Sequence, residues 1–332
     1  MSAALPDGFR IHRPTIDDAE AILDVVRAHD IATIGEPDIT IEDVLELMQK
    51  PGHHLDADEW LVSDAAGTLT AWGYVDDSYS GERVRIDVNA RPDNARPVIE
   101  ALVEVLLARA GELAAEKGLE GMRVRASAPH GATDLRAVYE QAGFELDRYY
   151  GRMNIDLTGD ERAPEPPEGV EVKVFTELPD RDEAARIHHR IMDTGFADLD
   201  DHVSIAFDTW WANTAASGNT PYDEWRVVFV EGEPAAVLQT ANIGAADNGG
   251  WIRNLVVHPG FRGRGLAQLL LGTAFALFAE KGRTWVGLSV DTGNSTGAFK
   301  IYEKVGMRPK YMIDVLKAWV PASSPAADPT VS

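Results

Sequence analysis

The segment with the clearest chemical potential is a run of glycine and arginine that directly follows an apolar stretch. It reads VHPGFRGRGLA over residues 257–267. We expect a strand to end at Val257 and a helix to begin near Gly263, which places the glycine-rich turn at a helix N-terminus. The first amides of a helix lack intrahelical partners, and the helix dipole adds partial positive charge there. Because glycine lets a ligand approach the backbone closely, the turn predicts a cradle for a phosphate or diphosphate.

The charges around this turn support the prediction. The chain of 332 residues has a formal net charge of −23, yet residues 248–279 contain no Asp or Glu. Arg253, Arg262 and Arg264 lie in that window. Such a window in an acidic chain favours an anionic ligand. The turn is not a Walker loop, because it lacks the Gly-Lys-Ser/Thr ending, and it does not match the Gly-x-Gly-x-x-Gly of dinucleotide-binding folds.

A second group of residues follows the next predicted strand, with Asn294 expected to open a helix and Tyr302 to lie within it. With the glycine-rich turn, these residues resemble the GNAT superfamily of acetyl-CoA-dependent N-acetyltransferases. The family's Q/R-x-x-G-x-G/A motif stands here as residues 262–267. Its N-x-x-x-A-x-x-x-Y-x-K-x-G-F/M block stands as residues 294–307. The resemblance covers residues 170–317, and it implies an acetyl-CoA site in the second half of the chain.

The resemblance also implies individual roles. The strand residues would pair with the pantetheine arm, the amides of the turn would hold the pyrophosphate, and Asn294 would bond the cofactor amide. Tyr302 would donate a proton to the departing thiolate, which is feasible for a phenol of pKa about 10 and a thiol of pKa about 8.5. An aromatic residue on this helix can equally be an ordinary core residue. The implied cofactor-binding residues are Leu255, Val256, Val257, Arg262, Gly263, Arg264, Gly265, Leu266, Ala267 and Asn294.

The general base is less clear from the sequence. Keeping an alkylammonium of pKa about 10.4 neutral at pH 7 costs about 4.6 kcal/mol, so a base or a chain of water molecules is useful. Many members of the family carry Glu on the strand before the cradle, where this chain has Trp251. Asp291, at the end of the next strand, is therefore our candidate for the catalytic base. The alternatives are water, backbone carbonyls and four residues of the expected acceptor region, His188, His189, Asp193 and Tyr222.

The elements that must position these residues occur twice along the chain. Aligning Tyr139 with Tyr302 also aligns Gly143 with Gly306 at the same offset of 163 residues. We therefore predict an α/β fold of two tandem GNAT-like domains, each a mixed twisted sheet with helices on both faces. In the first copy Asp93 stands opposite Arg262 and the glycines are absent, so that domain is expected to be structural or to shape the acceptor site. The predicted boundaries are a degenerate domain at 1–157, a linker at 158–169, the acetyl-CoA-binding domain at 170–318 and a disordered tail at 319–332.

The predicted elements follow the apolar periodicity. The long helix of the second half has one apolar stripe that includes Leu266, Leu270 and Leu277. In the first half, a strand at 84–88 precedes the corresponding long helix at 95–117. In the second half we expect strands at 170–175, 226–230, 234–243, 251–257, 285–290 and 311–317, and helices at 181–194, 201–216, 263–281 and 295–305.

Composition excludes several classes of function. The acidic charge opposes general binding to nucleic acid backbones or to anionic membranes. The chain has no cysteine, which excludes disulfides, cysteine-ligated metals and a cysteine nucleophile. The histidine pairs at 53–54 and 188–189 do not predict a metal site, because adjacent helix residues point about 100° apart. No targeting or membrane-spanning segment is visible, so we expect a cytoplasmic protein without a metal.

The expected reaction is direct transfer of an acetyl group to an amine of a small molecule, in a ternary complex. Two alternatives stay open. The tandem layout is similar to that of mycothiol synthase and related actinobacterial tandem proteins, and a cysteinyl sugar would then be the acceptor. An acyl-CoA-binding regulator without turnover would keep the cradle and need no catalytic acid. The sequence does not predict the acceptor, the acyl length or the oligomeric state.

Overall fold

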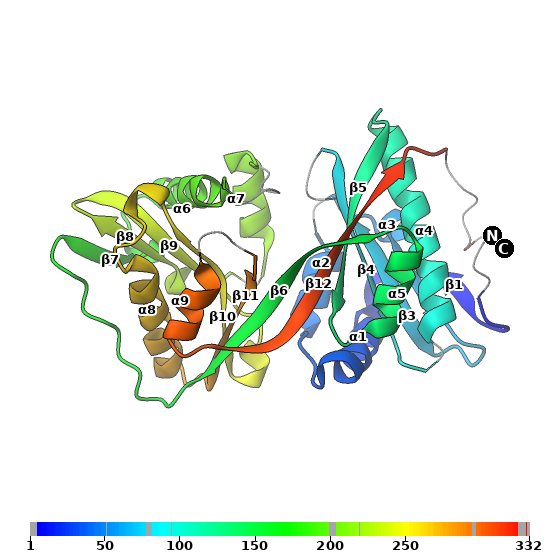
Figure 1. The fold of residues 1–332 in the computed structure, drawn as a ribbon, viewed down its shortest axis with the longest axis horizontal. Helices are drawn as coiled ribbons and strands as arrows, with labels where there is room; N and C mark the ends of the chain where they lie inside the picture. Colours follow the sequence, from blue (N-terminus) through cyan, green and yellow to red (C-terminus); the bar gives the residue numbers. More distant parts are fainter. Residues whose placement is uncertain are drawn as a thin grey trace. The chain divides into compact units, whose positions relative to one another are not determined.

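The computed structural model describes residues 5–50, 52–77, 81–93, 95–198, 204–218, 220–293, 297–324 and 330. The chain divides into two compact units of mixed α/β structure (Figure 1). Unit 1 consists of Met1–Tyr150 and Tyr311–Ser332, and unit 2 of Gly151–Lys310. The predicted fold class is thereby confirmed. Among the described residues, no helix combines the length and the apolar character that crossing a membrane requires.

The sheet of unit 1 has the strand order β1-β2-β3-β4-β5-β12. β4 and β5 are parallel, and the other neighbouring pairs are antiparallel. Helices α4 and α5 pack against one face of the sheet, and α1 and α2 pack against the other. The strands are β1 (Arg10–His12), β2 (Glu59–Ser63), β3 (Leu69–Asp76), β4 (Arg83–Ala90), β5 (Gly121–Pro129) and β12 (Arg308–Pro321); the helices are α1 (Ala19–Ile34), α2 (Ile41–Met48), α3 (Leu55–Asp58), α4 (Ala95–Glu116) and α5 (Thr133–Gln141).

The sheet of unit 2 has the strand order β6-β11-β10-β9-β8-β7. β10 and β11 are parallel, whereas β7 to β10 form antiparallel neighbours. Helices α8 and α9 pack against one face and α6 against the other, where α7 adds aromatic side chains. The strands are β6 (Glu145–Asp156), β7 (Val170–Val174), β8 (Arg226–Val230), β9 (Glu233–Ala241), β10 (Gly249–Val257) and β11 (Trp285–Asp291); the helices are α6 (Arg181–Phe196), α7 (Phe207–Ala216), α8 (Leu266–Glu280) and α9 (Ala298–Lys304).

The structure divides the chain differently from the sequence-based boundaries. β12 continues to Pro321, and from Tyr311 onward it belongs to unit 1 rather than to the second domain. It pairs antiparallel with β5 from Ile313↔Pro129 to Pro321↔Gly121, so residues 319–321 are part of a strand and not of a disordered tail. The other long strand, β6, passes from unit 1 to unit 2 at Gly151.

The burial of β12 explains why this strand joins the sheet of unit 1 and not that of unit 2. Leu316 is fully buried in the core of unit 1, and Ala318 and Val320 pack on the same core. Pairing with β12 also satisfies the backbone groups along the edge of β5, which an open sheet edge would leave exposed. The two halves share one pattern of strands, so the sequence repeat cannot distinguish which copy each final strand joins.

Candidate functional site

The two parallel strands at the centre of unit 2 separate soon after they begin. β10 and β11 pair only at Gly249↔Trp285, Gly250↔Val286 and Trp251↔Gly287, although β10 continues for six further residues. On its other side, β10 has a register shift between Ile252 and Asn254, which marks a β-bulge. A bulge bends its strand and interrupts the ladder. The result is a gap between the strands in which the backbone of residues 255–257 can pair with an extended ligand.

The glycine-rich turn lies at the end of this gap and opens helix α8. Gly263 and Gly265 have φ values of +78° and +79°, in the left-handed region that favours glycine. A Cβ atom added at Gly263 would meet nothing within 4 Å, and one at Gly265 only Gln268 Oε1 at 3.9 Å. The turn is thus open to a bulky ligand. α8 begins at Leu266 and not near Gly263 as predicted, because these positive φ angles are not helical.

The two arginines of the turn make different contacts. Arg262 donates through Nη1 to Asp198 Oδ2 at 2.8 Å and through Nη2 to the carbonyl of Gly195 at 2.9 Å. The guanidinium of Arg264 lies 5.2 Å from the ring centroid of Phe261. Both arginines are exposed. Arg262 thus connects the turn to the end of α6, and Arg264 provides positive charge at the surface of the turn.

Tyr302 lies on α9 in the core under the gap. It is 8% exposed and packs in the same apolar cluster as Leu266 and Met307. Burial raises the pKa of Tyr302 to about 12, so the phenol keeps its proton at neutral pH. This state suits a proton donor and is equally that of a core tyrosine. Asn294, the other residue implied by this motif, lies outside the described residues.

Asp291 lies at the end of β11 and on the opposite face from Tyr302. Val286, Leu288 and Val290 belong to the cluster of Tyr302, and successive strand residues alternate between faces. Asp291 is therefore on the α6 side of the sheet. It is half-buried, and its Oδ1 accepts a hydrogen bond from the amide of Gly293 at 2.9 Å. The two predicted catalytic side chains thus flank the gap from opposite faces.

The sequence reasoning missed a buried polar chain that begins at the gap. Asn254 Nδ2 donates to Gln239 Oε1 at 2.8 Å, and Gln239 Nε2 lies 3.4 Å from His188 Nδ1. His188 is fully buried beside the rings of Phe175 and Trp225. Burial lowers the pKa of His188 to about 3, so the imidazole is neutral. The signal available in the sequence is faint, since it consists of single polar residues in an apolar strand and an apolar helix face.

The other candidates for a base are engaged in structural contacts. His189 Nε2 lies 2.7 Å from the carbonyl of Ile205, and the Tyr222 hydroxyl donates to the carbonyl of Thr214 at 3.2 Å. Trp251 has the Arg152 guanidinium 3.5 Å from its ring centroid. At the β10 position where the family resemblance implies a Glu, this chain therefore has a stacked aromatic side chain.

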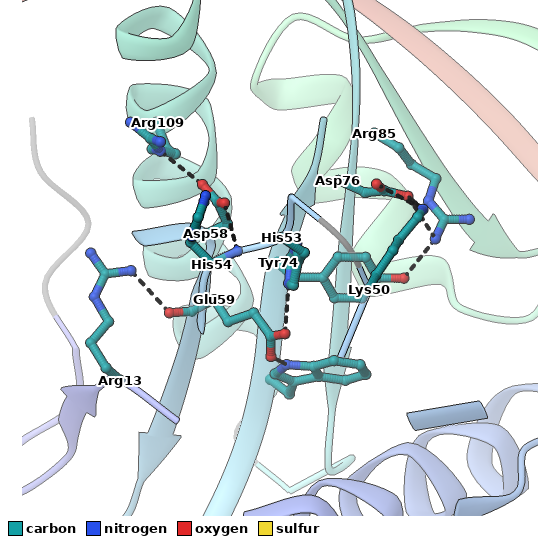
Figure 2. Close-up of polar contacts among 11 residues, drawn as sticks. Arg13, Lys50, His53, His54, Asp58, Glu59, Tyr74, Asp76, Arg85 and Arg109 are labelled. Carbon is teal, nitrogen blue, oxygen red and sulfur yellow. Dashed lines mark hydrogen bonds and ion pairs between the residues drawn. The ribbon is translucent and has the colours of Figure 1, made fainter. Parts of the chain in front are cut away.

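Unit 1 uses its polar side chains to join its own elements (Figure 2). Glu59 is fully buried, with Oε1 2.7 Å from His53 Nε2 and Oε2 accepting from the Trp72 indole at 2.7 Å. Arg109 on α4 donates to Asp58 at 3.0 Å. These pairs fix α3 and the preceding loop to the sheet and to α4. The contact with Glu59 gives His53, the first histidine of the adjacent pair at 53–54, a structural role.

The strand of unit 1 that corresponds to β10 lacks two features of the gap. β4 pairs with β3 in unbroken register from Ala71↔Ala90 to Asp76↔Arg85, without a bulge. After β4, the chain presents the exposed Pro92 and Asp93 where unit 2 has its glycines. A carboxylate there repels a diphosphate, as the sequence comparison anticipates.

Comparison with known protein families is informative for unit 2. The model of the acetyltransferase (GNAT) family matches residues 184–307, which include the gap, the turn and Tyr302. Unit 2 contains a GNAT acetyltransferase domain. This GNAT domain is an acyltransferase domain. A search of curated proteins finds no match to the chain.

Solved structures show a similar fold over both units of the chain. A GCN5-related N-acetyltransferase from Sphaerobacter thermophilus is 24% identical, with a TM-score of 0.80 over 97% of this chain and 99% of its own. A tandem GNAT protein from the clavulanic acid biosynthesis pathway is 16% identical, with a TM-score of 0.67 over 95% of this chain and 100% of its own. The N-myristoyltransferase of Saccharomyces cerevisiae, solved with bound myristoyl-CoA, is 9% identical, with a TM-score of 0.62 over 97% of this chain and 81% of its own.

Proposed function

We propose that unit 2 transfers the acetyl group of acetyl-CoA to an amine of a small molecule, in a ternary complex. The observation that carries this proposal is the open turn at Gly263 and Gly265, which leads into α8 beside the separated strands β10 and β11. The amides of residues 263–267 hold the pyrophosphate, because unpaired helix amides and the helix dipole both favour an anion. The backbone of residues 255–257 pairs with the pantetheine arm, and Asn294 bonds the cofactor amide, as the family resemblance implies.

The chemistry requires two proton transfers on opposite sides of the gap. The neutral amine attacks the thioester carbon, so that a C–N bond forms and the C–S bond then breaks. Tyr302 gives its proton to the departing thiolate and recovers a proton from solvent. The nitrogen loses its surplus proton to Asp291, directly or through water. The opposite faces of Tyr302 and Asp291 suit this division, because one group serves the sulfur side and the other the nitrogen side.

Direct transfer agrees with the side chains that the chain contains. There is no cysteine to carry an acetyl-enzyme thioester. The chain has a formal net charge of −23, which favours a cationic small molecule as partner over a nucleic acid. Unit 1 has Asp93 where unit 2 has its glycine-rich turn. It serves as a structural or acceptor-shaping domain and binds no acetyl-CoA.

The decisive experiment measures CoA release from acetyl-CoA over a panel of amines, with CoA separated by chromatography so that thiol-containing acceptors do not interfere. The panel contains aminoglycosides, polyamines, amino acids, peptides with a free N-terminus and a cysteinyl sugar. Isothermal titration with CoA runs in parallel. Amine-dependent CoA release supports the proposal. CoA binding without release for any amine identifies a binding protein, and failure to bind CoA overturns the cradle itself.

A further inference from the structure

We propose that Asn254 receives the acceptor amine through its side-chain oxygen, and that Gln239 and His188 fix the carboxamide in that orientation. The inference rests on the proposed function of unit 2, because it names the residue that holds the amine of that reaction. It makes Asn254 a substrate-contacting residue, whereas Gln239 and His188 are positioning residues.

Asn254 lies where the amine has to arrive. It follows the bulge on β10, past the last pair that β10 forms with β11. Its strand neighbours Leu255 and Val257 pack on the α8 side with Tyr302, whereas Val256 packs on the α6 side. By alternation along the strand, Asn254 shares the α6 side with Val256. The amine therefore meets Asn254 on the face opposite to the one that provides the proton for sulfur.

The direction of the hydrogen-bonded chain determines which carboxamide atom faces the gap. Gln239 uses Oε1 to accept from Asn254, so the Gln239 group facing His188 is its NH₂, which can only donate. His188 Nδ1 must then be an unprotonated acceptor. Within the described part of the chain, the side chain of Asn254 makes this one hydrogen bond, through Nδ2. Its Oδ1 remains as an acceptor for an N–H of the substrate.

The environment of His188 keeps the chain in this direction. The imidazole lies between Phe175 and Trp225, with ring centroids 5.5 Å and 5.0 Å away, and its Nε2 is buried without a hydrogen-bond partner among the described residues. Protonation would put an unsolvated charge in this aromatic enclosure. A neutral His188 accepts from Gln239 at every physiological pH, so the orientation of Asn254 does not change with pH.

Receiving the amine in this way directs its lone pair. An amide oxygen accepts a hydrogen bond but does not take a proton in water, so Asn254 orients the nitrogen and leaves deprotonation to Asp291. Holding one N–H at Oδ1 restricts the rotation of the nitrogen and presents the lone pair to the thioester carbon. The buried His188 Nε2 has no hydrogen-bond partner among the described residues, which lowers the stability of the fold. In return, the neutral His188 keeps Asn254 Oδ1 oriented as an acceptor for the amine.

Unit 1 offers a matched control. Tyr74 and Asp87 pair across β3 and β4 as Gln239 and Asn254 pair across β9 and β10, and the Tyr74 hydroxyl donates to Asp87 Oδ2 at 3.2 Å. In unit 1 the residue on β4 accepts the hydrogen bond, whereas in unit 2 the corresponding residue on β10, Asn254, donates it. Tyr74→Phe removes this cross-strand bond without touching the machinery of unit 2.

The test compares four full-length variants in steady-state assays with the fastest amine of the panel. Asn254→Leu removes the oxygen, and Asn254→Asp keeps an oxygen at that place. His188→Phe fills the aromatic enclosure and removes the acceptor for Gln239, and Tyr74→Phe is the control. Loss of one oriented hydrogen bond predicts that Asn254→Leu and His188→Phe lower kcat/KM for the amine about tenfold, with the Kd of acetyl-CoA unchanged. Tyr74→Phe stays close to the native value. Asn254→Asp keeps an acceptor but loses the donor to Gln239, so its kcat/KM falls between those of Asn254→Leu and the native chain.

Thermal unfolding separates positioning from a structural role. His188→Phe removes a buried nitrogen that lacks a partner, but it also leaves the buried Gln239 NH₂ without its acceptor, so we expect its Tm to stay near the native one while its kcat/KM falls. A His188→Phe variant with native kcat/KM overturns the proposal. So does an Asn254→Leu variant that is as active as Asn254→Asp, since a packing role would favour the apolar side chain.

A second measurement remains decisive if no amine of the panel is acetylated. Propylamine is titrated into the full chain saturated with CoA, and the side-chain NH₂ resonances of Asn254 are followed by NMR, with Asn254→Asp used for assignment. A saturable shift that is weakened in His188→Phe supports the inference, even where the absence of turnover refutes the proposed reaction. Unmoved resonances overturn the inference, while CoA binding by the native chain still tests the cradle separately.

Discussion

Arg262 at the mouth of the glycine turn forms an ion pair with Asp198 just beyond α6, with 2.8 Å between Nη1 and Oδ2. The two side chains are 33% and 57% exposed, so the pair stabilises the fold little. Asp198 competes with a diphosphate for the same guanidinium. We expect Asp198→Ala to tighten CoA binding about two- to threefold and Arg262→Gln to weaken it, as measured by isothermal titration at low salt. Equal affinities for the three proteins would show that Arg262 does not bind the diphosphate.

The cradle can be tested with two glycines of the same conformation. Gly263 and Gly282 have φ values of +78° and +73°, and an added Cβ meets no atom within 4 Å at either position. Gly263 precedes the N-terminus of α8 and Gly282 follows its C-terminus. Alanine at each position should cost about 1–2 kcal/mol of stability. Gly263→Ala alone should weaken CoA binding, by tenfold or more, and comparable losses in both variants would point to strain rather than to a lost binding site.

Tyr302 can be tested for its role as acid by removing one oxygen atom. Tyr302→Phe preserves the ring in its apolar cluster and deletes the proton donor. General acid catalysis is worth about 10²–10⁴-fold, so we expect kcat to fall by about 10²-fold with the Kd of CoA unchanged. The corresponding Tyr139→Phe variant in unit 1 should retain native kcat. A Tyr302→Phe enzyme with full turnover would leave this residue a core residue only.

The comparison of Tyr302 and Asn254 shows what the sequence can predict about the site. The turn and Tyr302 are recognisable because their signals are local: glycines that adopt positive φ before a helix, and a tyrosine at fixed spacing after the next strand. The chain from Asn254 to His188 depends on the register of β9 against β10 and on where α6 packs. Neither is encoded in a short motif, so this part of the site required the structure.

The fold shows the same division. Most strands and helices of unit 2 form close to their predicted ranges, because apolar periodicity is a local property. The exceptions are α7, which begins at Phe207 rather than at residue 201, and β6, which was not predicted. The assignment of β12 to unit 1 depends on burying Leu316 against β5, a contact between residues far apart in the chain. The apolar pattern of β12 would suit the sheet of either unit, and only its packing against β5 determines which sheet it joins.

His188 gives the native protein a defined acid sensitivity. Its pKa is about 3 in the fold, against 6.5 for an ordinary histidine, so between these values the unfolded chain binds one more proton. The titration of His188 therefore does not affect the stability of the fold above pH 6.5, and the free energy of unfolding decreases as the pH falls below that value. At pH 4.5 the loss is roughly 2–3 kcal/mol. Urea titrations at pH 7 and 4.5 should show His188→Phe losing correspondingly less stability than the native chain, while the exposed His54→Phe variant follows the native chain.

Replacing Asp291 with asparagine separates its proposed role as a base from its hydrogen bond to the Gly293 amide. Asp291→Asn retains an Oδ1 acceptor for the Gly293 amide but cannot take a proton. We expect kcat/KM for the amine to fall about 10²-fold at pH 7. The deficit should shrink with rising pH, because hydroxide in solution can then take the surplus proton of the nitrogen in place of Asp291. Asp180→Asn, whose Oδ1 accepts two backbone amides at the start of α6, is the matched control. A deficit that persists unchanged at high pH would assign Asp291 to the turn alone and leave deprotonation to water.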